Sequence, residues 1–144
     1  MAKTIRRLTI DDYDDMLHVW AVSGLPFRPH GRESREKIER EIAHPTCAFF
    51  GTFVDEKMIG VVIAQFDGRR GWINRLAIDP DFRGEKLAGG LIAECEQYLD
   101  QFGEMVISAL IEDENGPSMS CFEKSGYACL PSIKYWSKRP REDL

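Results

Sequence analysis

A chain of 144 residues is long enough to bury one hydrophobic core, so the sequence predicts a single domain spanning residues 1–144. Its formal net charge of -5 argues against nucleic acid as a partner, because nucleic-acid-binding domains usually carry a basic excess. No apolar run approaches the length of a membrane span, and residues 1–7 lack the apolar segment of a signal peptide. We therefore expect a cytoplasmic protein without a membrane partner.

The first half of the sequence alternates between strand and helix patterns. Residues 3–8 predict a short strand, and Thr9 with the acids that follow it is typical of a helix start. Apolar residues at helical spacing continue to Gly24. After a loop that contains prolines and glycines, residues 34–43 predict a more polar helix. Three β-rich runs then predict an antiparallel meander, because only short polar turns separate them. These runs are residues 47–54, 58–66 and 71–78.

The second half of the sequence contains the best-patterned helix. Residues 87–102 carry one continuous apolar stripe, and residues 105–111 form an apolar run typical of a buried central strand. Pro117 suits the first turn of a further helix that ends near Gly126, and residues 127–137 predict one or two closing strands. The elements together predict an α/β (α+β) fold, in which helices flank a mixed, mostly antiparallel central sheet.

The cysteines predict no metal site. None of the four forms a C-x-x-C pair, and no histidine stands at zinc-ligand spacing beside them. We expect small, reduced residues in or near the core.

The most informative segment is the strand–turn–helix unit of residues 76–90. The turn carries Arg83 and Gly84, and the helix opens on the small residues Ala88 and Gly89. A helix N-terminus exposes unpaired N–H groups and about half a positive charge, so it favours anions. Small residues there let a diphosphate approach the backbone closely. The alternative is a tight β–α turn in which glycine serves packing alone.

Two motifs in this sequence resemble those of the GNAT superfamily of N-acetyltransferases. Residues 83–88, Arg-Gly-Glu-Lys-Leu-Ala, resemble the family hallmark R/Q-x-x-G-x-G/A, and they follow a triplet at residues 76–78 that is similar to L-A-V. Residues 112–127 resemble a second signature, in which an asparagine leads into a helix that ends in Y-E-K-x-G-F. The resemblance covers nearly the whole chain. It implies a GNAT-like sheet with a splay between the strands at about 71–78 and 105–111.

The resemblance also implies that acetyl-CoA binds as the co-substrate. The backbone of residues 76–78 would pair with the pantetheine arm, and the Ile78 N–H would hold the thioester oxygen as it becomes negative. The amides of residues 84–89 would hold the diphosphate. The implied cofactor-binding residues are Leu76, Ala77, Ile78, Arg83, Gly84, Glu85, Lys86, Leu87, Ala88, Gly89, Asn115 and Ser118.

Two positions in these motifs depart from the family pattern. Lys86 stands where the hallmark has its first glycine, and we expect it to have a negative φ in the first turn of the helix. Phe122 replaces a tyrosine that in many members protonates the departing thiolate. Ser118 and Tyr135 are the candidate replacements for that donor, although a helix-capping or solvent-facing serine is the alternative for Ser118.

The proton acceptor and the amine site depend on residues outside the two motifs. Asn74 stands where some members carry a glutamate base, so Glu112 is the candidate acid for a proton relay through water. In this family the loop between the first two helices forms one wall of the acceptor cleft, which implies residues 23–32 here. Phe27, Arg28 and Asn74 are the candidate substrate-binding residues. Two arginines in this loop favour an acceptor with a carboxylate.

The expected function is acetyl transfer from acetyl-CoA to a primary amine, by direct attack in a ternary complex. The amine is a small molecule or a protein, and the chain is a monomer or a homodimer. The alternative is a non-catalytic acyl-CoA-binding or sensor module of the same fold. Phe122 and Asn74 favour this alternative, because neither side chain supplies the usual acid or base.

Overall fold

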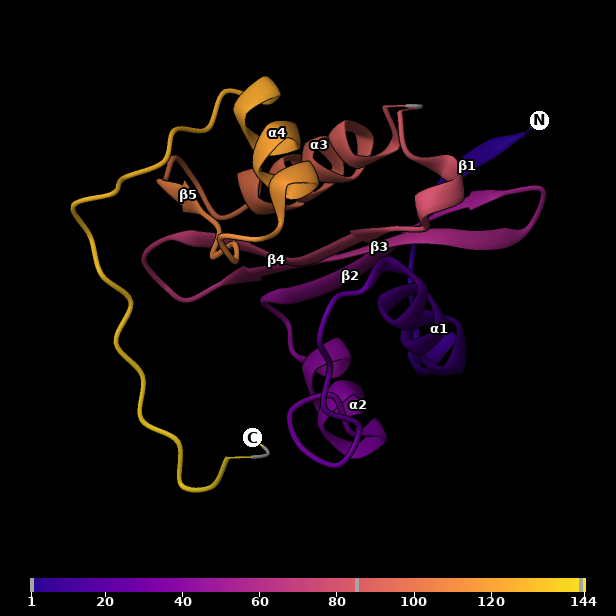
Figure 1. The fold of residues 1–144 in the computed structure, drawn as a ribbon, viewed down its shortest axis with the longest axis horizontal. Coiled ribbons are helices and arrows are strands. Elements are labelled where there is room, and N and C mark those ends of the chain that lie inside the picture. The colour runs from indigo at the N-terminus through magenta and orange to yellow at the C-terminus, as the bar shows by residue number, and fades with distance from the viewer. Residues whose placement is uncertain (1, 85, 143) are drawn as a thin grey trace.

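The sheet is the centre of the fold, as Figure 1 shows for the computed structural model, which describes residues 2–84, 86–142 and 144. Its strand order is β1-β2-β3-β4-β5. The first three pairings are antiparallel and the β4–β5 pairing is parallel, so the expected mixed, mostly antiparallel sheet is confirmed. The strands are β1 Lys3–Arg7, β2 Cys47–Val54, β3 Lys57–Phe66, β4 Gly71–Ile78 and β5 Ile107–Ser108.

Two helices cover each face of the sheet (Figure 1). Helices α1 (Tyr13–Ser23) and α2 (Arg35–Ala43) lie on one face, and α3 (Leu87–Asp100) and α4 (Gly116–Lys124) on the other. The interior strand β2 is buried along its whole length, as expected for a strand covered on both sides. Among the described residues, no helix is both long and apolar enough to cross a bilayer.

The sheet divides the buried side chains into two hydrophobic clusters. One cluster joins α3 and α4 to the sheet and contains Leu91 and Leu99. The other joins α1 and α2 to the opposite face and contains Trp20 and Ile38. Side chains alternate along a strand, so neighbouring residues of β4 enter different clusters. Leu76 and Ile78 belong to the first cluster, whereas Ala77 belongs to the second.

A β-bulge interrupts β4 just before its end. Ile63 of β3 pairs with Asn74, but Val61 pairs with Ala77, so Arg75 and Leu76 together oppose one residue. Arg75 has a φ of 60°, in the left-handed region that costs a non-glycine residue about 1 kcal/mol or more. A bulge of this kind bends and twists the strand that carries it.

Strands β4 and β5 contact each other only at one end. Gly71 pairs with Ile107 and Trp72 with Ser108, and no further pair follows among the described residues. The splay predicted between these strands is therefore present, and it leaves the edge of β4 open toward Ile78. The expected strand over 105–111 shortens to two residues, because β4 no longer runs beside it.

The strands predicted over residues 127–137 do not form. The described chain after Tyr127 is extended but pairs with no strand, and it runs past β5 toward the end of the molecule where α2 lies (Figure 1, yellow). Its apolar side chains lie in solvent, with Tyr135 70% and Trp136 88% exposed. Alternating β-formers are insufficient to make a strand where no neighbouring edge pairs with them.

The start of α1 depends on an ion pair whose contribution should vary with pH. The Asp12 carboxylate accepts hydrogen bonds from both terminal nitrogens of Arg6, at 3.0 and 2.8 Å, and one from the Thr9 N–H at 2.9 Å. The bonds from Arg6 lower the pKa of Asp12 below its ordinary value. A lowered carboxyl pKa stabilises the fold above about pH 4, and the stabilisation is lost as the pH falls.

We expect Asp12→Asn to reduce the free energy of unfolding by about 1 kcal/mol at pH 7, since Arg6 is half-exposed and solvent screens the pair. The difference from wild type should shrink at pH 3. Urea unfolding at the two pH values measures it. An equal difference at both would contradict a role for the charge.

Candidate functional site

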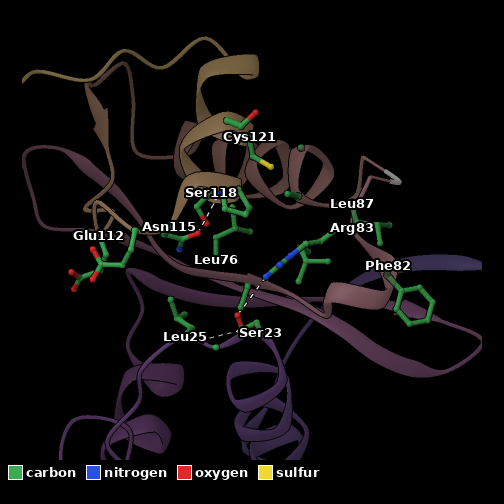
Figure 2. A pocket seen from close by; sticks show the side chains of 18 of the residues that line it. Ser23, Leu25, Leu76, Phe82, Arg83, Leu87, Glu112, Asn115, Ser118 and Cys121 are labelled. Carbon is green, nitrogen blue, oxygen red and sulfur yellow. Dashed lines mark hydrogen bonds between the residues drawn. The ribbon is translucent and has the colours of Figure 1, made fainter.

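One cavity of about 1040 Å³ contains most of the residues that the sequence singles out. Figure 2 shows it between α3 and α4 on one side and the chain after α1 on the other, with the end of β4 between them. Glu85, a predicted cofactor residue, lies outside the described residues. All the other predicted cofactor residues line the cavity: Leu76, Ala77, Ile78, Arg83, Gly84, Lys86, Leu87, Ala88, Gly89, Asn115 and Ser118.

The open edge of β4 forms one wall of this cavity. The Asp79 N–H donates to the Ile59 carbonyl of β3 at 2.7 Å. Backbone groups point to alternate sides along a strand, so those of Ile78 point away from β3. Because β5 has already diverged, the Ile78 N–H faces the open side. This wall can therefore hydrogen-bond an extended ligand and a carbonyl oxygen.

The N-terminal end of α3 forms a second wall. Gly84 has a φ of 89° and turns the chain into the helix, and a side-chain carbon at Gly84 or Gly89 would meet no atom within 4 Å. Space beside the backbone is thus open where a 14-residue helix presents its first N–H groups. The residues present fit a diphosphate at this end of the cavity.

Lys86 differs from its predicted conformation. It is the residue that precedes α3, and its φ is 62° rather than negative. The expectation was wrong because Lys86 stands outside the first helical turn and completes the turn from the strand. A left-handed conformation there explains why the family hallmark has glycine at this position.

Helix α4 forms a third wall, and Asn115 fixes its start. The side-chain oxygen of Asn115 accepts a hydrogen bond from the Ser118 N–H at 3.2 Å and caps the helix. That bond leaves the amide nitrogen of Asn115 as a donor toward the cavity. Ser118 and Cys121 also line the cavity from this helix (Figure 2).

The two aromatic positions considered for proton donation both lie away from the cavity. Phe122 is buried in the cluster on the α3 side, where its ring meets that of Tyr127 edge-on at 5.1 Å. Tyr135 is in the exposed chain after α4 and does not line the cavity. Of the two predicted donors, only Ser118 lines it.

The loop after α1 lines the cavity from the opposite face of the sheet. Leu25, Arg28 and Arg32 contribute to this side. The other two predicted substrate residues do not: Phe27 packs near Trp20, with 6.4 Å between ring centroids, and the Asn74 amide donates to Gln65 at 3.3 Å.

Charged residues of both signs line the cavity. Arg83 reaches across it, and its Nη2 donates to the Ser23 carbonyl at 3.4 Å (Figure 2). Exposed Glu112 lies away from Phe82 in that view, and exposed Glu114 also lines the cavity. The predicted relay acid, Glu112, therefore shares one cavity with the predicted cofactor residues.

A buried cluster of charged residues, which the sequence did not predict, lies beside the acceptor loop, residues 23–32 after α1. Glu33 is 5% exposed and contacts Arg32, with 2.9 Å between Oε2 and Nε, and Arg75, with 3.7 Å between Oε1 and Nη2. Burial lowers the pKa of Arg75 to about 10. The Arg75 guanidinium also lies 4.8 Å from the centre of the Trp20 ring. A charged residue inside the apolar run 71–78 was the available signal, because a buried cation requires a partner.

Comparisons with known proteins agree with this geometry. Residues 11–127 match the profile of the Acetyltransferase (GNAT) family. Acetyltransferase SG1711 of Sodalis glossinidius (strain morsitans) is 30% identical over 139 residues, which cover 96% of each chain.

Solved structures of other N-acetyltransferases share the fold. The PaiA N-acetyltransferase of Thermoplasma acidophilum in complex with coenzyme A superposes with a TM-score of 0.75 at 22% identity, over 86% of this chain and 88% of that one. The aminoglycoside N-acetyltransferase AAC(6')-Iy, in complex with a bisubstrate analogue, superposes with a TM-score of 0.79 at 17% identity, over 96% of this chain and 99% of that one. The chain described here belongs to the acetyltransferase (GNAT) family.

Proposed function

We propose that this enzyme transfers the acetyl group of acetyl-CoA directly to a primary amine while both are bound. The family makes the chain an N-acetyltransferase with acetyl-CoA as its co-substrate. One observation carries the direct mechanism: a single cavity is lined both by the cofactor-binding residues and by the loop after α1. Donor and acceptor can therefore meet without an acetylated side chain as a carrier.

The cofactor orientation follows from the walls of the cavity. The open edge of β4 would pair with the pantetheine arm, with Asn115 as a further donor. The N-terminal end of α3, with Arg83 and Lys86 beside it, would hold the diphosphate. The Ile78 N–H would then face the thioester carbonyl at the junction of the two binding regions.

Bound acetyl-CoA supplies an activated acetyl carbon, to which the amine nitrogen bonds as the carbon–sulfur bond breaks. The Ile78 N–H would donate to the carbonyl oxygen as that oxygen gains negative charge. Glu112 would receive the proton that the amine loses, through water. Ser118 would donate toward the departing sulfur, and water suffices to protonate a thiolate whose conjugate acid has a pKa of about 8.5.

We expect Glu112→Gln to lower kcat by roughly 100-fold with little change in the affinity for coenzyme A, because the proton route is lost while the cofactor walls remain. The neighbouring Asp113→Asn is a matched control, since this exposed residue does not line the cavity. Steady-state kinetics measure both variants. Equal kcat values for Glu112→Gln and wild type would remove Glu112 from the proton route.

The function as a whole is tested by following free thiol release from acetyl-CoA with a panel of amines. An amine-dependent rate, together with mass-spectrometric detection of the acetylated amine, is the expected result. Thiol release that no amine raises above background would overturn the proposal. Calorimetric titration with coenzyme A then separates a protein that binds without turnover from one that does not bind.

A further inference from the structure

Arg28 places a positive charge on the acceptor side of the cavity, which is the side lined by the loop after α1. No negatively charged side chain among the described residues pairs with it there. Its side chain is half-buried and lines the cavity. Within the described parts of the chain, no carboxylate forms an ion pair with its guanidinium, and only its backbone N–H bonds to an acid. A half-buried guanidinium with open hydrogen-bonding positions can bind an anionic group of a ligand.

The loop that carries Arg28 is held by Glu33. The Glu33 carboxylate accepts from the Arg28 N–H at 2.7 Å, and the Glu33 N–H donates to the Arg28 carbonyl at 3.0 Å. The Tyr13 hydroxyl donates to the Glu33 carbonyl at 2.6 Å and ties this closed loop to α1. The Arg28 side chain therefore extends into the cavity from a fixed backbone.

The acidic residues near Arg28 interact with other arginines. The Glu33 carboxylate faces both Arg32 and Arg75, so it does not also neutralise Arg28. Glu41 interacts with Glu33 and Arg75, and within the described parts of the chain it forms no ion pair with Arg28. The acceptor side thus keeps a net positive charge, whereas Glu112 and Glu114 line another part of the same cavity.

We infer that the acceptor is a small amine that also carries a carboxylate, which Arg28 binds while the amine faces the part of the cavity lined by Glu112. This inference rests on the proposed acetyl transfer and adds the substrate class. A guanidinium and a carboxylate form two parallel hydrogen bonds, which fix orientation as well as affinity. A polycationic acceptor would instead place a positive group against Arg28.

Matched pairs of amines test the inference by thiol release. Each pair is an amino acid and its carboxamide, in a series where the number of carbons between amine and carboxylate varies. For the best pair, we expect wild-type kcat/KM to be at least about tenfold higher for the acid, because an ionised group strengthens the hydrogen bonds. Arg28→Met should bring the acid down to the level of its amide, and Arg28→Lys should keep part of the preference.

Arg40→Met is the control, since it removes an exposed arginine of α2 that does not line this cavity and should leave the ratio intact. Coenzyme A affinity and Tm verify that each variant folds. Equal rates for acid and amide in wild type, or a preference that survives Arg28→Met, would overturn the inference while leaving acetyl transfer in place. The absence of turnover with every amine would overturn both.

Discussion

Gly89→Glu is expected to weaken coenzyme A binding by about 100-fold or more, because it places a carboxylate at the proposed diphosphate site and like charges brought together cost several kcal/mol. Gly89 lies in the first turn of α3, between Leu87 and Asp100, and lines the cavity. A Cβ atom there would meet no atom within 4 Å, so we expect the glutamate to extend into the cavity without displacing the core. We therefore expect Gly89→Glu to fold normally although it binds coenzyme A weakly.

Isothermal titration with coenzyme A measures this loss, and two further variants separate its causes. Gly89→Gln has the size of glutamate without the charge and should bind more tightly than Gly89→Glu. Ala93→Glu adds the same charge to an exposed position of α3 outside the cavity and should bind like wild type. Retained affinity in Gly89→Glu, with a normal Tm, would show that the diphosphate binds elsewhere.

Glu33→Ala is expected to reduce the free energy of unfolding by about 3 kcal/mol, because it leaves the buried Arg75 guanidinium without its nearest carboxylate. The Arg75 side chain is 17% exposed, so water replaces the lost partner poorly. Glu41 also acts on the Arg75 charge, but among the described residues it forms no ion pair with Arg75. Arg28 also loses the acceptor of its backbone N–H, so the KM for the amine should rise.

Urea unfolding measures this change, with Glu33→Gln and Glu39→Ala as comparisons. Glu33→Gln keeps an acceptor oxygen but not the charge, and should fall between wild type and alanine. Glu39 is exposed in the middle of α2, so its replacement should change stability by about 0.5 kcal/mol or less. A loss in Glu33→Ala as small as that of Glu39→Ala would mean that Arg75 does not depend on Glu33.

Local patterns explain which parts of the fold could be predicted. Strand 71–78 begins and ends where predicted, and the helix predicted over 34–43 spans Arg35–Ala43, because turn residues and capping side chains act within a few positions along the chain. Residues 127–137 have the same strand-forming composition but no partner edge, and no local pattern reports whether one exists. Strand 105–111 shortened for a related reason, since a bulge at Arg75 sends β4 away from it.

The parts of the site that continuous motifs form could be predicted from the sequence. The parts that depend on contacts between distant segments could not. The turn into α3 and the Asn115 cap belong to continuous motifs, and their residues line one cavity. The Glu33–Arg75 contact joins residues more than forty positions apart, so no sequence window contains both. The conformation of Lys86 was missed because this residue was placed in the first turn of α3 rather than in the turn that precedes the helix.

The separation of the buried side chains into two clusters bears on how this enzyme can change over evolutionary time. The cofactor walls rest on the cluster around Leu91, and the acceptor loop rests on the cluster around Trp20, with the sheet between them. Substitutions in sites that share no contacts add in their effects, so new acceptor preferences can arise around Arg28 without weakening coenzyme A binding, provided that they leave the Arg83–Ser23 hydrogen bond between the two sides in place. Residues 76–78 line the cavity and send side chains into both clusters, so a substitution there affects both sites.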